Sequence, residues 1–390
     1  MKKLLFVLYG LCGLGVYLNL YFGISNFFTT GYTYSLVALL CFYSFKKLRL
    51  SPAVALGVYA FLFSLFAAEF SIRYILKYPL SYGEQNGGDY ILVDRHQKRN
   101  DFLFKYIKGR KDIYTLQFDS GEIRNYSCPD YPYPDERCNA FGLRGALPDK
   151  NKKIILTLGD SFTEGLGAPA DSCYPALLRN YIVAKDSLQD VLNAGVAGND
   201  IFFDWKMLQK LQDRYQLKQL IFLMNVTDVN DVATRGGKER FKPDGFLQFK
   251  ARPAWEPLYA VSFVFRLFMH NVFKLDYNLQ TEQQVTARNA EALNKIQELM
   301  KKEIIPWSQQ HGTGILFVLH PLRHQVKEND LLYRQMLYTL QQVNGAKVLD
   351  CLPAIKTQNR AEDLYWPNDQ HFKPAGYNII ANLVIDSCYR

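Results

Sequence analysis

Residues 154–165 read IILTLGDSFTEG and decide the fold. The apolar run at 154–158 is rich in β-favouring side chains and ends at a Gly-Asp-Ser turn, and a helix-compatible segment follows at 174–184. This order predicts a buried strand of an open α/β sheet, in which the carboxyl ends of the strands carry the chemistry. The Ser161 hydroxyl is therefore predicted to lie at that end of the sheet.

A second motif, DQHFKPAG at residues 369–376, lies near the end of the chain. A serine hydroxyl becomes a nucleophile when a base accepts its proton, and a carboxylate can fix the tautomer of that base. Ser161, His371 and Asp369 are therefore a candidate hydrolytic triad once folding brings them together. The other histidines fit this role less well: His96, His270, His311, His320 and His324. Of these, His320 and His324 are the nearest rivals of His371.

The net charge of +9 is unevenly distributed. Residues 1–77 carry seven Lys or Arg against one acid, Glu69, which leaves +3 for the other 313 residues. Basic flanks of apolar segments are typical of membrane proteins. No basic cluster interleaved with aromatic residues is present, so the sequence argues against a nucleic-acid partner. No residue spacing suggests a metal site, and no cofactor is predicted.

Two runs near the start of the chain, residues 4–45 and 50–68, contain no charged side chain. One helix needs about 20 apolar residues to cross a bilayer, so the first run has room for two crossings with a turn near residues 23–31. We therefore expect residues 1–77 to be a transmembrane region of three helices. A single long helix with a re-entrant piece is an alternative. A cleaved signal peptide is disfavoured, because no small-residue cleavage site follows.

The basic residues fix an orientation for this region. Lys2 and Lys3 share a side of the membrane with Lys46, Lys47 and Arg49 if two crossings separate them, and positive flanks stay cytoplasmic. The third helix then exports everything after about residue 72.

Beyond the membrane region, residues 78–150 read as short strands and turns, a β-rich lead-in segment. From residue 152 apolar runs alternate with helical patterns, which predicts a parallel sheet covered by helices over residues 151–390. An insertion at 232–284 interrupts this rhythm. It could act as a lid or line a pocket, or its helix at 259–274 could simply face the core. The candidate strands are 154–158, 191–194, 220–225, 315–319 and 348–350.

The chain has seven cysteines, five of them in the part predicted to be exported. An oxidising compartment permits disulfides there. Cys128 and Cys138 bracket a loop rich in Pro and Tyr and are the first predicted pair, and Cys351 with Cys388 is a second candidate. Buried free thiols are the alternative for the second pair.

Three motifs, GDSFTEG at 159–165, NAGVAGND at 193–200 and DQHFKPAGY at 369–377, occur in this order. Together they resemble the SGNH (GDSL-like) hydrolases, and more specifically the membrane-anchored bacterial branch related to alginate and cell-envelope acetyl-transfer enzymes. The resemblance covers about residues 139–390. It does not cover the membrane segment or most of the lead-in.

The resemblance implies a flavodoxin-like three-layer α/β fold with a Ser-His-Asp centre. It implies that Ser161 is the nucleophile, His371 the base and Asp369 the residue that orients it. It also implies an oxyanion hole to which Ser161 and Gly198 contribute backbone amides. A glycine fits at position 198, because the backbone must approach the substrate oxygen closely.

One element departs from the family pattern. The family places an oxyanion-binding asparagine after its third strand, whereas residues 225–228 here read NVTD and put Thr227 at that position. A threonine hydroxyl can donate a hydrogen bond but reaches less far, and losing one oxyanion donor can cost ~10²–10³ in rate. Asn225 or Asn230 could substitute if the loop is shifted.

The sequence thus predicts a membrane-tethered, extracytoplasmic serine esterase or O-acyltransferase. It would be a multi-pass protein of a bacterial inner membrane with its catalytic domain on the periplasmic side. The expected substrate is an acyl group, such as acetyl, on an envelope glycan or lipid, processed through an acyl-serine intermediate. The alternative is a catalytically degenerate binding or scaffold protein of an envelope assembly complex, a reading that Thr227 favours. The sequence predicts no particular protein partner.

Overall fold

Five parallel strands form the sheet in the computed structural model of this 390-residue chain. Their order is β2-β1-β3-β4-β5. The chain moves from β1 to one side for β2 and then to the other side of β1 for β3, so β1 and β3 flank the point at which the strand order reverses. All five predicted strands are confirmed, with these bounds: β1 Lys153–Gly159, β2 Gln189–Asn193, β3 Gln216–Met224, β4 Gly314–Leu319 and β5 Val348–Asp350.

The structure describes residues 27–48, 51–75, 139, 141, 143–235, 237–238, 262–275, 281–366 and 371–390. The short strands predicted in the lead-in segment lie outside these residues. So do the first predicted membrane crossing and Asp369.

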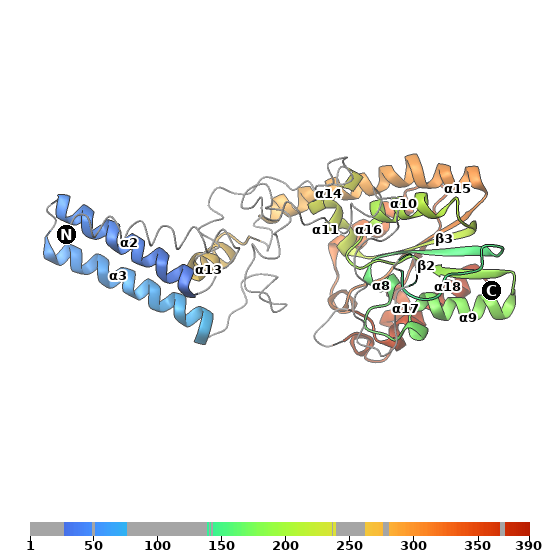
Figure 1. Cartoon of the computed structure of the whole chain (residues 1–390), viewed down its shortest axis with the longest axis horizontal. Helices are drawn as coiled ribbons and strands as arrows, with labels where there is room; N and C mark the ends of the chain where they lie inside the picture. Colours follow the sequence, from blue (N-terminus) through green and yellow to red (C-terminus); the bar gives the residue numbers. More distant parts are fainter. Residues whose placement is uncertain are drawn as a thin grey trace. The chain divides into compact units, whose positions relative to one another are not determined.

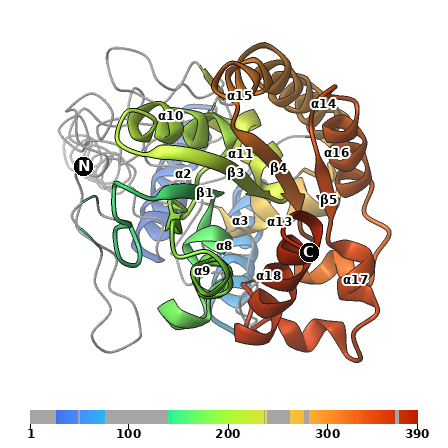
Figure 2. The same ribbon diagram turned by 90° about the vertical axis from the view of Figure 1, so that its right-hand side faces the viewer.

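Helices cover both faces of the sheet, as expected for a three-layer α/β fold (Figures 1 and 2). One face carries α9 (Tyr174–Lys185) and α18 (Pro374–Cys388). The other carries α10 (Ile201–Leu211), α14 (Glu282–Leu299) and α15 (Ile305–His311). A π-helical turn, η6, joins α14 to α15. Further elements of this domain are η4 Ala170–Ser172, α11 Val226–Arg235, η6 Met300–Ile304, η7 Arg323–Val326, α16 Leu331–Gln341, α17 Leu352–Lys356 and η8 Ala361–Leu364.

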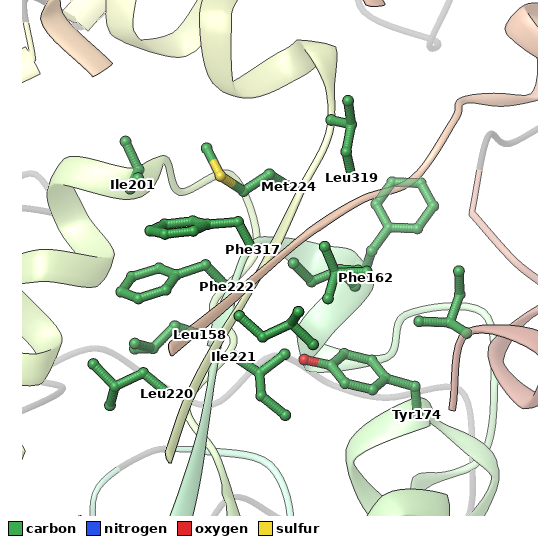
Figure 3. Packing of buried hydrophobic residues seen from close by; sticks show 14 of the residues in the cluster. Leu158, Phe162, Tyr174, Ile201, Leu220, Ile221, Phe222, Met224, Phe317 and Leu319 are labelled. Carbon is green, nitrogen blue, oxygen red and sulfur yellow. The ribbon is translucent and has the colours of Figure 1, made fainter. Parts of the chain in front are cut away.

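The central strands are buried on both faces, which is why their sequences are nearly continuous apolar runs. Phe222 of β3 and Phe317 of β4 lie side by side in the sheet register, and their rings stack with centroids 5.2 Å apart (Figure 3). Leu158 of β1 is fully buried in the same core. This packing fixes the strand ends that carry the polar residues of the site.

Contacts divide the chain into two compact units, one of Met1–Arg110 with Phe249–Thr286 and the other of Lys111–Gln248 with Ala287–Arg390. The sheet belongs to the second unit. The predicted boundary at residue 77 lies outside the described residues, and the domain limits stay a prediction.

The first unit contains two neighbouring helices, α2 (Phe27–Leu48) and α3 (Pro52–Phe70), followed by a π-helical turn at Ser71–Ile75. Within the described residues, α3 is the one helix long and apolar enough to cross a membrane, and α2 contains a shorter apolar stretch, Tyr34–Tyr43. The turn predicted near residues 23–31 is wrong for its second half, because α2 is already helical from Phe27.

The second candidate disulfide is wrong. Cys351 and Cys388 are both free thiols. Cys351 is fully buried directly after β5, where burial raises the pKa of its thiol. Cys388, at the end of α18, instead accepts a hydrogen bond from the Gln219 side-chain amide of β3 at 3.3 Å. The other predicted pair, Cys128 and Cys138, lies outside the described residues.

Candidate active site

Ser161 is the first residue of a short helix, α8 (Ser161–Glu164), which begins directly after β1. Asp160 caps this helix, since its carboxylate accepts a hydrogen bond from the backbone two residues on at 2.9 Å. Gly159 makes the turn with a φ of 143°, and a Cβ there would collide with the side chain of Thr163 and the backbone of β3. These features place the Ser161 hydroxyl at the carboxyl end of β1, as predicted from the sequence.

The imidazole of His371 meets this hydroxyl across 210 positions of sequence. Its Nε2 lies 2.7 Å from Ser161 Oγ, within hydrogen-bond distance. A strand-like turn presents the ring: Trp366 N donates to the His371 carbonyl at 3.0 Å, and Tyr365 pairs with Phe372 in an antiparallel bridge. The structure therefore brings together two of the three members of the predicted triad.

The ring of Phe162 packs against the ring of His371. Its side chain is 4% exposed, and its ring lies 4.8 Å from the His371 ring, 4.3 Å from His320 and 5.4 Å from Phe372, measured between centroids. This aromatic cluster restricts the orientation of His371 without using either of its nitrogen atoms.

The third member, Asp369, lies outside the described residues, and its role stays a prediction. Asp350, at the end of β5, is another carboxylate at the carboxyl ends of the strands. Its carboxylate accepts hydrogen bonds from the Tyr333 hydroxyl at 2.6 Å and from Leu352 N at 3.0 Å, so it is already engaged at the end of β5.

The loop that carries Gly198 is held against α8. The buried carboxylate of Glu164 accepts a hydrogen bond from Ala197 N at 2.7 Å. Gly195 packs so closely that a Cβ on it would collide with the backbone of Thr163 and Glu164. Gly198 itself has a φ of 74°, a conformation that favours glycine. Glu164 is thus a supporting residue that the sequence reading did not single out, although it lies within the GDSFTEG motif.

The Thr227 hydroxyl is already used in a hydrogen bond to a neighbouring side chain. Its hydroxyl donates to Asn225 Oδ1 at 2.7 Å, and its backbone N–H donates to the same oxygen at 2.8 Å. The hydroxyl would have to rotate away from Asn225 before it could bind an oxyanion. Asn230, the other substitute, accepts a hydrogen bond from Arg288 at 3.2 Å. Its proposed contribution stays a prediction.

Asn225 is fully buried at the end of β3 and joins two elements of the site. Its side-chain nitrogen donates to Asp160 Oδ2 at 2.9 Å and lies 3.2 Å from His320 Nε2. His320 Nδ1 lies 3.1 Å from the carbonyl of Pro321. A neutral ring with its proton on Nδ1 satisfies both contacts, because Nε2 then accepts from Asn225. Burial agrees with this assignment, since it lowers the pKa of His320 from 6.5 to about 3.

From the sequence, Asn225 and His320 are separate candidates, as a possible oxyanion donor and a rival base, and their contact with each other is not predicted. Asn225 and His320 each follow a buried apolar strand directly, the position at which parallel sheets bring functional side chains together. His320 competed in the sequence with His371 as the base. In the structure, both ring nitrogens of His320 have hydrogen-bond partners other than Ser161. The contact with Ser161 is made by His371.

Across the ranges that the structure describes, no group of three or more His, Cys, Asp or Glu side chains could hold a metal ion. Asp160 and Asp228 come close to each other without forming such a group. Burial raises the pKa of Asp160, and it raises the pKa of Asp228 well above its usual range, with a further contribution from the charge of Asp160.

The parallel sheet and the order of its motifs define the class of protein, an α/β protein with a GDSL-like domain. The chain belongs to the GDSL-like lipase/acylhydrolase family, whose model matches residues 157–379. No curated protein matches the chain in a sequence comparison.

Several solved structures are similar to part of the chain. TesA is 10% identical, with 61% of this chain and 98% of TesA covered and a TM-score of 0.39. Axe2, an acetylxylan esterase from Geobacillus stearothermophilus, is 14% identical, with 62% and 97% covered and a TM-score of 0.35. A two-domain esterase (CEX) active on acetylated mannans is 13% identical, with a TM-score of 0.36. The match covers 61% of this chain and only half, 50%, of that esterase.

We predict that Glu164→Ala lowers kcat by up to ~10²-fold, because the loop carrying Gly198 loses the acceptor for Ala197 N and the site loosens. Glu164→Gln is the matched control, since its amide oxygen can still accept that hydrogen bond. Both are compared by ester hydrolysis at saturating substrate, with circular dichroism to check folding. Equal activity of the two variants would show that the Glu164 contact does not position the loop.

A second prediction concerns stability against pH. Because the pKa of Asp228 is raised in the folded state, the folded chain keeps a proton that the unfolded chain releases above its pKa of 3.8. Unfolding is therefore increasingly favoured as the pH rises from that value to the folded-state pKa. Asp228→Asn removes this effect and keeps an oxygen acceptor for Asn225 N.

We expect the gain in urea midpoint of Asp228→Asn over the parent to grow as the pH rises above about 4. The exposed Asp213→Asn is the control and should show no such trend. A gain for Asp228→Asn that is the same at every pH would contradict the proposed buried proton.

Proposed function

We propose that this family member is a membrane-tethered, extracytoplasmic serine esterase or O-acyltransferase. The observation that carries the chemistry is the 2.7 Å contact between His371 Nε2 and Ser161 Oγ. This contact supports the proposal, because nucleophilic acyl transfer needs an imidazole nitrogen within reach of the attacking hydroxyl. Asp369 is proposed to hold the His371 ring in the productive tautomer.

The reaction follows from these positions. Ser161 Oγ attacks the ester carbonyl carbon while its proton passes to His371 Nε2. The carbonyl oxygen becomes negative and is bound by the backbone amides of Ser161 and Gly198, with Thr227 as a third donor after its hydroxyl rotates. The ester C–O bond then breaks, and the leaving alkoxide takes the proton from His371. The acyl group is now an ester of Ser161.

The second half of the reaction releases the acyl group. His371 removes a proton from water or from an acceptor hydroxyl, whose oxygen attacks the acyl-serine, and the proton then returns to Ser161. Water gives hydrolysis, and a sugar hydroxyl gives transfer.

The proposed membrane tether favours a substrate that is itself close to the membrane. We propose an acyl group, acetyl for instance, on an envelope glycan or lipid. Support for the tether comes from the length and composition of α3 and from the exposed apolar side chains of α2 and α3, such as Leu40, Phe61 and Phe63. Support for the orientation comes from Lys46 and Lys47 in the last turn of α2 and from Arg49 directly after it, which favour a cytoplasmic connection to α3 and an external hydrolase domain. The membrane is proposed to be a bacterial inner membrane that the chain crosses more than once.

One observation favours a second candidate, a degenerate binding or scaffold protein of an envelope assembly complex. The Thr227 hydroxyl is engaged by Asn225 and the family's oxyanion-binding asparagine is missing from that position. An enzyme is favoured over this candidate because the Ser161–His371 contact is intact.

The chemical proposal is tested with the full chain in detergent, a fluorophosphonate probe and a p-nitrophenyl acetate assay. The parent chain should be labelled, and Ser161→Ala should lose both labelling and turnover. Asp369→Asn should retain its fold and lose roughly 10³–10⁴ in kcat, because the base loses control of its tautomer. No labelling of the parent at any pH from about 6 to 9, where serine hydrolases work, would favour the binding protein. Near-normal turnover of Asp369→Asn would reassign the orienting residue.

The topology is tested by fusing a reporter after residue 80, beyond the third predicted helix. Alkaline phosphatase, which requires an oxidising compartment, should be active there. A reporter active only in the cytoplasm at this position would contradict the extracytoplasmic assignment. A fusion within the loop at Arg49 should give the opposite result and serves as the control.

A further inference from the structure

Helix α13 (Phe263–Asn271) takes no part in the proposed chemistry, although it lies in the segment inserted between α11 and α14 of the hydrolase domain. Ser262 caps it, since its hydroxyl accepts a hydrogen bond from Phe265 N at 3.0 Å. The helix packs against α3 and the turn Ser71–Ile75 that follows α3. An insertion of the hydrolase domain therefore returns to the end of the apolar N-terminal helices.

A buried carboxylate holds α13 at this place. Glu69, next to the last residue of α3, is 2% exposed and accepts hydrogen bonds from the Ser262 hydroxyl, from Val264 N at 3.2 Å and from the Tyr34 hydroxyl at 3.2 Å. A buried charge is costly unless hydrogen bonds compensate it, and these donors come from α2 and from α13 with its cap. The contact thus ties α13 to both α2 and α3.

Apolar packing supports the same contact. Ile72, in the turn after α3, is buried against Val264 and Leu267 of α13. One side of α13 is therefore fixed to the end of the membrane helix.

Large apolar side chains of α13 and of the turn that follows it are exposed. Phe268 of α13 is 47% exposed, and Val272 and Phe273, directly after the helix, are 59% and 53% exposed; the two phenyl rings pack edge to face with centroids 5.3 Å apart. Lys274 follows and is exposed as well. An apolar face with aromatic residues and a neighbouring lysine is the pattern of a helix that lies in a membrane interface.

The distribution of exposed apolar residues agrees with this. In the described part of the sheet-containing unit, large exposed apolar side chains are few and scattered: Leu188, Leu331, Tyr338 and Trp366. In the unit with α13 they are dense on α3, which α13 contacts, and include Phe61, Phe63 and Phe70. The exposed face of α13 thus belongs to the unit whose helices are proposed to contact lipid.

We propose that α13 and the turn after it form an in-plane membrane element, with Phe268 of the helix and Val272 and Phe273 of the turn in the bilayer interface at the end of α3 from which the hydrolase domain leaves the membrane. This inference rests on the proposed membrane tether. It makes the insertion a second point of attachment, which residues 272–281 separate from α14 along the chain. The occupant of the apolar face is lipid, and Lys274 meets the headgroups.

The test uses the full chain in phosphatidylethanolamine–phosphatidylglycerol vesicles that contain a tagged phospholipid. The photoreactive residue p-benzoylphenylalanine replaces one aromatic residue at a time. Phe268 and Phe273 report on α13, Phe63 on the α3 span and Tyr338 on the exposed surface of the hydrolase domain. Lipid adducts are expected at positions 63, 268 and 273 and not at 338.

The outcomes separate the two proposals. Adducts at 63 without adducts at 268 and 273 would overturn the role of α13 and leave the tether intact. No adducts at 63 would overturn the tether, and the inference with it. Crosslinks from 268 or 273 to protein instead of lipid would assign this face to a second copy or a protein partner. Equal labelling at 338 would also overturn the inference, since the labelling would not be specific to α13.

A further pair of variants tests the contact with Glu69. Ser262→Ala, which removes a donor to Glu69 and the cap of α13, should lower the lipid adduct yield at position 273 and leave the yield at 63 unchanged. Ser64→Ala is the matched control, because the Ser64 hydroxyl bonds only within α3, to the carbonyl of Ala60 at 2.9 Å. An unchanged yield in Ser262→Ala would show that this contact does not hold α13 at the membrane.

Discussion

The hydrogen bond between His371 and Ser161 is the contact on which the functional reading depends. It closes a loop of more than half the chain, so everything between must fold correctly for the bond to form. The parallel sheet makes this possible, because β1 delivers Ser161 to the edge at which the strand order reverses. The segment before α18 then has to bring only the His371 ring to the carboxyl end of β1.

Beneath this contact lies a second layer of polar groups that do not face the substrate. Asn225 links Asp160, the cap of the nucleophile helix, to His320 at the end of β4. Neutral forms of Asp228 and His320 are favoured by burial, which avoids unpaired charge in the core. The network therefore connects the ends of three adjacent strands and restrains the turn that carries Ser161.

In the proposed arrangement, the N-terminal unit attaches the chain to the membrane at more than one point. A single apolar helix fixes one point of a chain. Glu69 joins the inserted helix α13 to α3 by a polar contact, and in the proposed arrangement the exposed Phe268 and Phe273 enter the same membrane as α3. An esterase attached in this way would meet substrates that are themselves held at the membrane.

The sequence by itself determined the five strands, the parallel α/β class and the serine and histidine of the site, because buried strands and Gly-Asp-Ser turns leave local signals. Only the tertiary structure decided how the remaining polar residues are used. It joined Thr227 and Asp160 to the Asn225 side chain and kept Cys351 apart from Cys388. It also packed an insertion helix on α3. These choices depend on contacts between residues far apart in the chain, and local pattern does not encode which distant partner a buried polar group will find.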